Sequence, residues 1–183
     1  QSRSSAASDV YKRQEIDILV NNAGYEQVCP SYELTEETWD TIMETNLKGA
    51  FFAAQAAAHS MARSSRGGAI VNVCSLTSYV GVPTAAPYGS SKSGLLGMTR
   101  ALSTEWASEQ IRVNAIAPGY FRTELTEAFY REQAWQEAML QKIPLNSFGN
   151  ANDLKGAVVF LVSDAAKYIT CLLYTSDAAD DLL

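Results

Sequence analysis

Three short apolar runs, separated by long helical segments, constrain the fold of this chain more than any other feature. Ile16–Asn21 (IDILVN) stops at an Asn-Ala-Gly turn, and Ala69–Val73 (AIVNV) is rich in β-branched residues. Ile111–Ala117 (IRVNAIA) stops at a Pro-Gly pair. Runs of this length and composition are typical of buried strands in a parallel sheet. We therefore expect three central strands.

Helical patterns fill the segments between these runs. Thr35 is suited to cap a helix whose first turn carries two glutamates, and the helical pattern continues to Met61 before Gly67-Gly68 ends it. Apolar residues recur at helical spacing over Pro87–Trp106, and helical regions are also expected over residues 124–140 and 152–162. Strand–helix alternation of this kind predicts an α/β fold, with a doubly wound parallel sheet between two layers of helices.

Composition narrows the possible partners. The chain has 183 residues, 47% of them hydrophobic, and a formal net charge of −6, so it lacks the basic surface that nucleic acids require. Its apolar runs are too short to span a membrane. Three unpaired cysteines and one histidine favour neither a disulfide framework nor a zinc site, so we expect no metal and a cytoplasmic location.

The two ends differ from the middle of the chain. Residues 1–14 (QSRSSAASDVYKRQ) and 171–183 (CLLYTSDAADDLL) resemble translations of the two opposite strands of a transposase adaptor that is used in sequencing libraries. We expect both to be non-native tails. The segment 15–170 is then one partial domain whose natural ends are not in the chain.

Polar motifs follow the predicted strands at the edge where ligands bind in parallel sheets. Asn21-Asn22-Ala23-Gly24 follows the first strand, and Ser75 follows the second. Tyr88 and Lys92 share one helical face because they lie four residues apart. The third strand leads into Pro118-Gly119-Tyr120-Phe121-Arg122-Thr123.

Together these motifs resemble the short-chain dehydrogenase/reductase family, in its branch without a large C-terminal substrate domain. The resemblance covers essentially all of residues 15–170 and implies a Rossmann-like fold and NAD or NADP as the cofactor. The thirteen-residue spacing between Ser75 and Tyr88 matches the family pattern, whereas Cys74 stands where another serine is more common. The resemblance implies catalytic roles for Asn46, Ser75, Tyr88 and Lys92. It implies cofactor contacts for Asn21, Ala23, Gly24, Tyr88, Lys92, Pro118, Gly119, Phe121 and Thr123, and substrate contacts for Ser75, Tyr88 and Tyr120.

These residue types suit hydride transfer at a carbinol or carbonyl carbon, which needs a group that exchanges a proton with the oxygen. A free tyrosine has a pKa near 10, and a neighbouring ammonium lowers it, so we expect Lys92 to make Tyr88 more acidic. Ser75 is expected to hold the substrate oxygen. Asn46 is expected to anchor a water that links Lys92 to solvent.

Ordinary structural roles remain open for several of these residues. Tyr88 and Lys92 also fit a surface pair, and Asn21 fits plain turn chemistry. Asn46 also fits a helix kink or a buried polar contact. Phe121 and Thr123 are equally compatible with loop packing.

The glycine-rich phosphate turn of a dinucleotide enzyme is missing before Ile16. Three strands with their helices would need roughly 75–90 further residues upstream. We therefore expect a sheet that lacks its first βαβ units and its last strand, and a chain that is inactive alone. The residue that selects NAD or NADP is absent with them.

The segment around Tyr120 looks most like family members that act on sugar acids such as gluconate, with Glu124, Phe129 and Trp135 in the substrate lid. A 3-oxoacyl-carrier-protein reductase is the alternative, and a non-catalytic binding or regulatory protein of the same fold is a second one. The family commonly forms tetramers through two long central helices, and the alanines of 53–58 allow close helix approach.

Overall fold

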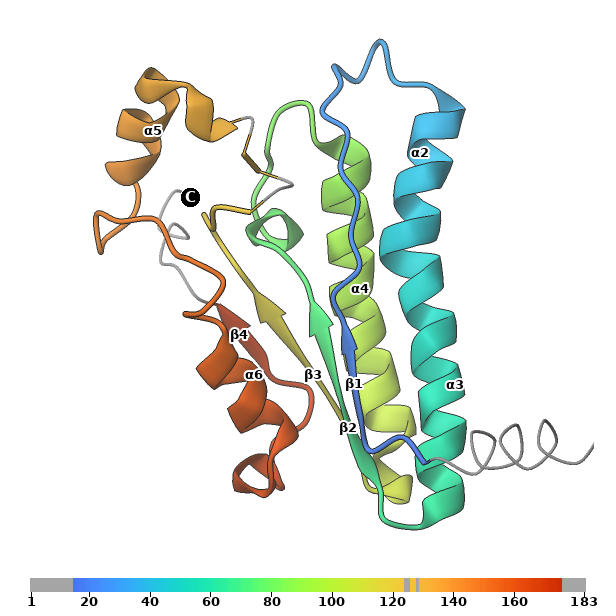
Figure 1. Cartoon of the computed structure of the whole chain (residues 1–183). Helices are drawn as coiled ribbons and strands as arrows, with labels where there is room; N and C mark the ends of the chain where they lie inside the picture. Colours follow the sequence, from blue (N-terminus) through green and yellow to red (C-terminus); the bar gives the residue numbers. More distant parts are fainter. Residues whose placement is uncertain (1–14, 124–125, 128, 176–183) are drawn as a thin grey trace, which may run out of the picture.

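The computed structural model describes residues 15–123, 126–127 and 129–175, and these form a parallel sheet between helices (Figure 1). The strands are β1 (Ile18–Asn21), β2 (Gly68–Val73), β3 (Ile111–Ala117) and β4 (Leu173–Thr175), in the order β1-β2-β3-β4. All three pairings are parallel, with Val20 opposite Val71, Val71 opposite Asn114, and Ala115 opposite Leu173. The α/β fold is confirmed, and the three central strands lie where the apolar runs predict them.

Helical elements connect the strands. The first connection contains α2 (Glu36–Met43), a π-helical turn (Glu44–Lys48) and α3 (Gly49–Ser64), and Thr35 caps α2 by accepting a hydrogen bond from the Thr38 N–H. The second contains α4 (Ala86–Glu105). The third contains α5 (Gln133–Leu140) and α6 (Lys155–Val162). Short 3₁₀ turns lie at Leu76–Ser78, Ala107–Glu109, Phe129–Arg131 and Asp164–Ala166.

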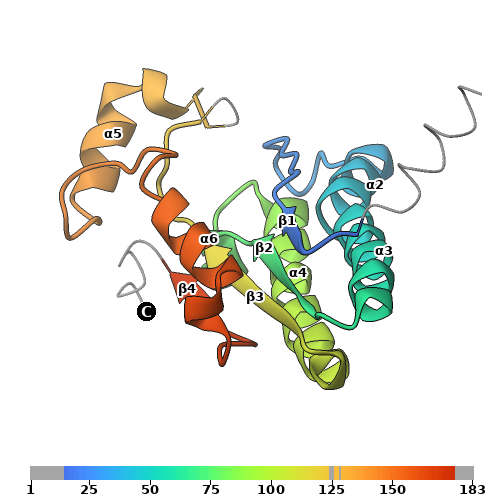
Figure 2. The same ribbon diagram turned by 60° about the horizontal axis from the view of Figure 1, so that its bottom comes forward.

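Helices cover the two faces of the sheet unequally (Figures 1 and 2). On one face α3 and α4 pack on Ile70, Val113 and Ala115. On the other face α6 packs on Val71 and Ile116 through Leu161, and it is the one α-helix of the described residues there. Within residues 15–175, apart from the gaps at 124–125 and 128, no helix has both the length and the apolar character needed to cross a membrane.

Half-buried Asn21 and buried Asn72 connect the first two strands to the helices. Asn21 donates one hydrogen bond to the Ala50 carbonyl oxygen (3.2 Å) and one to Asn72 Oδ1 (2.9 Å). The Asn72 amide donates in turn to Thr99 Oγ1 on α4 (2.8 Å). Because amides that are removed from water need hydrogen-bond partners, this series of hydrogen bonds fixes the register of β1 and β2 beneath α3 and α4.

Two expectations differ from the structure. Of the helical region expected over 124–140, the described residues form a turn at 126–127, a 3₁₀ turn at Phe129–Arg131 and the α-helix α5. The last strand, expected to be absent, is present as Leu173–Thr175, inside the segment expected to be a non-native tail. An open parallel edge pairs through backbone groups that almost every residue carries, so pairing needs no particular sequence. The presence of β4 therefore does not test whether residues 171–183 are a non-native tail, and that expectation stays a prediction.

Candidate active site

The candidate site lies at the carboxyl ends of β1, β2 and β3, where the loops after these strands meet. The loop after β2 is joined to the loop after β3 by a hydrogen bond from the Leu76 N–H to the Pro118 carbonyl (3.1 Å). Ser75 caps the short turn that follows β2, and its hydroxyl oxygen accepts from the Thr77 N–H (3.2 Å). These contacts hold Ser75 at the end of the central strand.

Tyr88 and Lys92 project from the first two turns of α4, which begins with Pro87 near its first position. The Ser75 hydroxyl lies close enough to the Tyr88 side chain to lower the pKa of the phenol. The Lys92 ammonium lies 5.6 Å from the centre of the Tyr88 ring and donates a 2.7 Å hydrogen bond to the Val73 carbonyl oxygen. The side chains of Ser75, Tyr88 and Lys92 therefore converge, and Lys92 is only 3% exposed.

Asn46 belongs to the π-helical turn between α2 and α3 and is buried. Its Oδ1 accepts from the Tyr25 N–H (2.7 Å), and its amide donates to the Tyr25 carbonyl (2.9 Å) and to Ser91 Oγ (3.0 Å). Ser91 donates to the Tyr88 carbonyl (2.7 Å). Asn46 thus links the loop after β1 to the helix that carries Tyr88. A π turn inside a helix frequently marks a functional site, because its extra residue redirects one side chain.

Gly24 brings the loop after β1 against the same cluster. A Cβ atom at this position would lie 3.6 Å from Lys92 Nζ and 3.8 Å from Asn46 Oδ1. The hydrogen atom of glycine therefore leaves open the space beside the Lys92 ammonium. Ala23 next to it is exposed.

Burial controls the ionisation of the cluster. It raises the pKa of Tyr88 to about 12; the negative charge of Glu26 acts in the same direction, and the Ser75 hydroxyl opposes it. Burial also lowers the pKa of Lys92, whereas Cys74 and Glu26 raise it. The sequence analysis predicts the opposite, a lowered pKa for Tyr88. The structure differs because burial dominates and Lys92 directs its ammonium to Val73 O.

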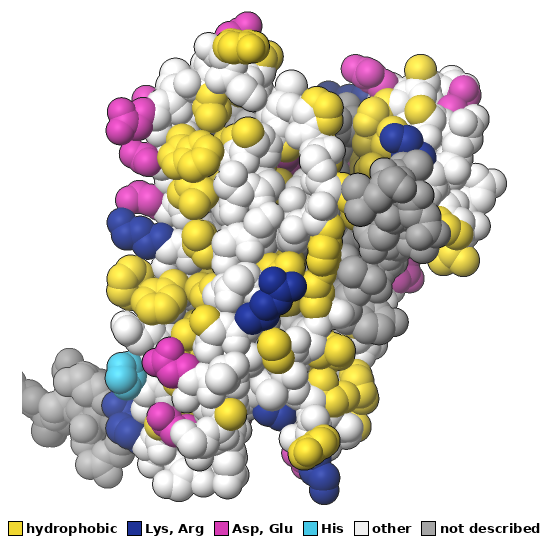
Figure 3. All heavy atoms as spheres, turned by 180° about the vertical axis from the view of Figure 1, so that it is seen from behind, with side chains coloured by type: hydrophobic (Ala, Val, Ile, Leu, Met, Phe, Trp, Pro, Cys, Tyr) yellow, Lys and Arg dark blue, Asp and Glu magenta, His cyan; other side chains and the backbone are white. Residues whose placement is uncertain are grey.

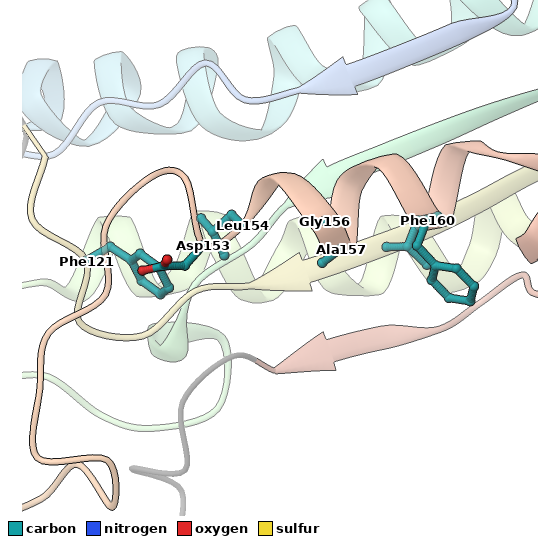
Figure 4. A pocket seen from close by; sticks show the side chains of 7 residues that line it. Phe121, Asp153, Leu154, Gly156, Ala157 and Phe160 are labelled. Carbon is teal, nitrogen blue, oxygen red and sulfur yellow. The ribbon is translucent and has the colours of Figure 1, made fainter.

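Three other predicted site residues make contacts with residues outside this cluster. The Asn21 amide is engaged with Ala50 and Asn72 beneath the helices. Phe121 is buried against Gly149 and lines a cavity of about 430 Å³ with α6, in which Figure 4 shows Phe121 beside Asp153. Thr123 is exposed and contacts Thr126.

The segment that is expected to contact the substrate lies beside several aromatic rings. Pro118, Gly119 and Tyr120 are half-buried, and the Tyr120 ring meets Trp135 edge to face at 5.9 Å. Trp135 also contacts Tyr130 and Phe148. Glu124 lies outside the described residues.

Sequence reasoning missed two polar residues of the site, Ser91 and Glu26. The i, i+3 spacing from Tyr88 was the available signal for Ser91, since it places both residues on one face of α4. An acidic residue two positions after the Asn-Asn-Ala-Gly turn was the signal for Glu26.

Comparison with known proteins shows which family the chain resembles. Residues 2–178 match a family model described as enoyl-(acyl carrier protein) reductase. The 2-dehydro-3-deoxy-D-gluconate 5-dehydrogenase of Escherichia coli K12 is 42% identical over 154 residues, which are 84% of this chain and 61% of that protein. The chain therefore spans less than two thirds of the length of this curated relative.

Two solved structures have a closely similar fold. One, from Sinorhizobium meliloti 1021, is provisionally described as a short-chain alcohol dehydrogenase; it is 60% identical, with a TM-score of 0.87 over 97% of this chain and 69% of that one. The other is a gluconate 5-dehydrogenase from Burkholderia cenocepacia J2315 in complex with NADP and tartrate. It is 34% identical, with a TM-score of 0.89 over 96% of this chain and 69% of that one.

Proposed function

The chain belongs to the short-chain dehydrogenase/reductase family, and on that premise we propose that the full-length protein transfers a hydride between NAD or NADP and a secondary alcohol or ketone. The observation that carries the proposal is the convergence of Ser75, Tyr88 and Lys92 at the carboxyl end of the sheet. Three groups of these types, with Lys92 buried and Ser75 and Tyr88 half-buried, provide a proton donor, a cation and a hydroxyl for the reacting oxygen.

The residues present fit a nicotinamide cofactor. Gly24 leaves space beside the Lys92 ammonium, and Lys92 and Tyr88 are suited to hold ribose hydroxyl groups there. The backbone of Ala23, Pro118 and Gly119 is available at the same edge. The nicotinamide, when bound, supplies or accepts the hydride.

Tyr88 is the residue that exchanges a proton with the substrate oxygen. With its pKa near 12, the phenol is protonated at neutral pH and can donate to the alkoxide that forms when a ketone is reduced. Ser75 lies near enough to Tyr88 to lower the pKa of the phenol, and its hydroxyl is suited to share the substrate oxygen. Oxidation of an alcohol requires the reverse transfer, which positive charge near the phenol favours because it stabilises the phenolate.

A polyhydroxylated substrate fits the aromatic side of the site, where Tyr120 and Trp135 meet. The names of the gluconate and deoxygluconate dehydrogenases among the relatives support a sugar-derived compound. A 3-oxoacyl-carrier-protein reductase remains the second candidate, which is supported by the name of a relative from Staphylococcus aureus that is 43% identical over 155 residues. A non-catalytic role is less well supported because Ser75, Tyr88 and Lys92 are all retained.

We propose that the protein assembles as a homotetramer in the cytoplasm. The outer sides of α2, the π turn and α3 carry apolar side chains in the view from behind (Figure 3), and Phe52 is 54% exposed. A groove of about 360 Å³ beside it is lined by Met43, Leu47, Phe51 and Met98, among others. Free Cys29, Cys74 and Cys171 suit a reducing compartment.

Substitution of the phenol tests the activity. We expect Tyr88→Phe in the full-length protein to lower kcat for NAD(P)-dependent oxidation of a secondary alcohol at least a hundredfold, because general acid–base catalysis contributes about 10²–10⁴-fold. Exposed Tyr32→Phe is the matched control. The proposed role of Tyr88 in proton transfer would be refuted if Tyr88→Phe and the wild type had equal activity in an assay that measures NAD(P)H absorbance.

A further inference from the structure

Ser91 is a fully buried residue of α4, one position before Lys92, whose hydroxyl the proposed chemistry does not use. This hydroxyl has two hydrogen-bond partners. It donates to the Tyr88 carbonyl oxygen (2.7 Å), three residues earlier on the same helix. It accepts from the side-chain amide nitrogen of Asn46 (3.0 Å), which is 45 residues away in the sequence. Ser91 therefore joins the part of α4 that carries Tyr88 to the π-helical turn.

The direction of these two hydrogen bonds fixes the orientation of the Asn46 amide. A serine hydroxyl has a single proton, and here the Tyr88 carbonyl receives it. The hydroxyl can then only accept, so the NH₂ group of Asn46 and not its oxygen faces Ser91. The same NH₂ group donates its other proton to the Tyr25 carbonyl (2.9 Å), and the Asn46 oxygen accepts from the Tyr25 N–H (2.7 Å). Each polar atom of the Asn46 side chain thus has a partner.

This orientation matters because the Asn46 oxygen borders the space beside the Lys92 ammonium. A Cβ atom at Gly24 would lie 3.8 Å from Asn46 Oδ1 and 3.6 Å from Lys92 Nζ. Rotation of the amide by half a turn would bring an NH₂ group to the same space as the ammonium. It would also place that NH₂ group opposite the Tyr25 N–H, which is another donor. The bond to Ser91 therefore keeps an acceptor where the loop after β1 meets Lys92.

Thr99, two helical turns further along α4, forms the same arrangement in a different place. Its hydroxyl donates to the Leu95 carbonyl (2.8 Å) and accepts from the Asn72 amide (2.8 Å). Because Asn72 belongs to β2, the Thr99 hydroxyl holds the sheet. The Ser91 hydroxyl instead holds a loop at the carboxyl edge of the sheet, where the candidate site lies.

Ser103 has only the local half of this arrangement. It is buried on α4, and its hydroxyl donates to the Arg100 carbonyl (2.8 Å), again three residues earlier. Among the described residues, this hydroxyl has no hydrogen-bond partner on another element. Bonds from serine to a preceding helical carbonyl are common. The bond from Asn46 is therefore what distinguishes Ser91 from an ordinary buried serine of a helix.

We propose that Ser91 is a positioning residue for cofactor binding, which fixes the orientation of the Asn46 amide and so holds the loop after β1 beside Lys92. This inference rests on the proposed hydride transfer and adds a residue to the same site. The loop contains Ala23 and Gly24, which are expected to contact the cofactor, so the KM for NAD(P) should depend on Ser91. The groups that exchange the proton keep their own contacts without the Ser91 hydroxyl, so kcat should change little.

The test is Ser91→Ala in the full-length protein, with circular dichroism to establish that it is folded. We expect the KM for NAD(P) to rise at least fivefold, because a buried amide loses its partner. The values of kcat and of the KM for the alcohol should stay within twofold of the wild type. Partial unfolding would instead lower kcat and leave both KM values unchanged. Ser91→Cys offers a weaker acceptor, so its KM for NAD(P) should lie between those of the wild type and Ser91→Ala.

A double-mutant cycle with Asn46→Ala isolates the contact between the two residues. Without the amide, Ser91 has nothing to orient, so adding Ser91→Ala to Asn46→Ala should change the KM for NAD(P) less than twofold. Ser103→Ala is the matched control, since it removes a buried hydroxyl with the same local bond, and it should leave all constants within twofold. An unchanged cofactor KM in folded Ser91→Ala, or equal effects of Ser91→Ala with and without Asn46, would overturn the proposal.

Amide hydrogen exchange provides a readout that needs no activity. The Tyr25 N–H donates to Asn46 Oδ1, so its exchange with deuterated solvent should be at least fivefold faster in Ser91→Ala and unchanged in Ser103→Ala. Equal exchange rates in Ser91→Ala and the wild type would contradict the role of Ser91. Absence of hydride transfer by the wild type with every alcohol and ketone tried would overturn the proposed function, and the exchange rates would still decide whether Ser91 holds the loop.

Discussion

Tyr88 illustrates how a single residue depends on its surroundings for its chemistry. An exposed phenol ionises near pH 10, whereas burial raises the pKa of Tyr88 to about 12. Burial works against Lys92 as well, whose pKa falls for the same reason. The two shifts have the same main cause, which is loss of contact with water, and at Lys92 it outweighs the opposing effects of Cys74 and Glu26.

The raised pKa of Tyr88 predicts a specific loss of stability in alkali. The folded protein holds the phenolic proton more tightly than the unfolded chain, so this contribution is complete below pH 10 and is lost as the pH rises from 10 to 12. Two pKa units correspond to a loss on the order of 2–3 kcal/mol. Denaturant titrations of wild-type and Tyr88→Phe full-length protein across this range should show the extra fall only in the wild type.

Tyrosinate absorbance provides an independent readout of the same group. One phenol of the wild type should titrate later than the exposed ones, and Tyr88→Phe should remove that late step. The assigned pKa of Tyr88 would be contradicted if the stability of the two proteins fell equally with pH and the late absorbance step were still present in Tyr88→Phe.

At the scale of secondary-structure elements, the π turn at Glu44–Lys48 determines where the site residues meet. It interrupts the long helical connection without breaking it and directs Asn46 toward Tyr25 and Ser91. Replacing the amide removes three hydrogen bonds at once and releases the loop that contains Gly24.

Asn46→Ala is therefore expected to lower kcat at least tenfold and to raise the KM for NAD(P), because the loop after β1 no longer has a fixed position beside Lys92. Thr45→Ala, an exposed neighbour on the same turn, is the control and should leave both constants nearly unchanged. Initial-rate kinetics with far-ultraviolet circular dichroism separate this effect from unfolding. Wild-type kinetics in a folded Asn46→Ala variant would show that the amide is dispensable.

The same elements show why some features follow from sequence and others do not. Strands β2 and β3 are buried on both faces, so their apolar runs predict them closely, and the Thr35 cap is a local signal. The π turn is missed because a single extra residue barely changes a 3.6-residue period. Strand β4 is missed because it depends on backbone pairing with β3. Glu26 acquires its electrostatic role only when distant segments meet.

At the scale of the whole molecule, the sheet face beneath α6 is incompletely covered. Val20 is paired with Val71 in parallel register, so both side chains point to this face, but α6 covers Val71 and leaves Val20 39% exposed. Ile18 on the same strand is 49% exposed, and Phe160 on α6 is 43% exposed. Contiguous apolar surface of this kind calls for a covering segment. We propose that residues upstream in the full-length protein, which include the expected phosphate-binding turn, supply it.

This proposal predicts different cofactor binding by the two lengths of protein. The 183-residue chain should show no micromolar binding in a fluorescence titration with NADH or NADPH, whereas the full-length protein should bind at least one of them. The short chain should also bind a hydrophobic dye and self-associate, and Val20→Lys should reduce both effects because it charges the uncovered face. Circular dichroism first establishes that the short chain is folded. Micromolar cofactor binding by that folded chain would show that the residues after Ile16 are sufficient to hold the dinucleotide, and the assignment of phosphate binding to an upstream segment would then be wrong.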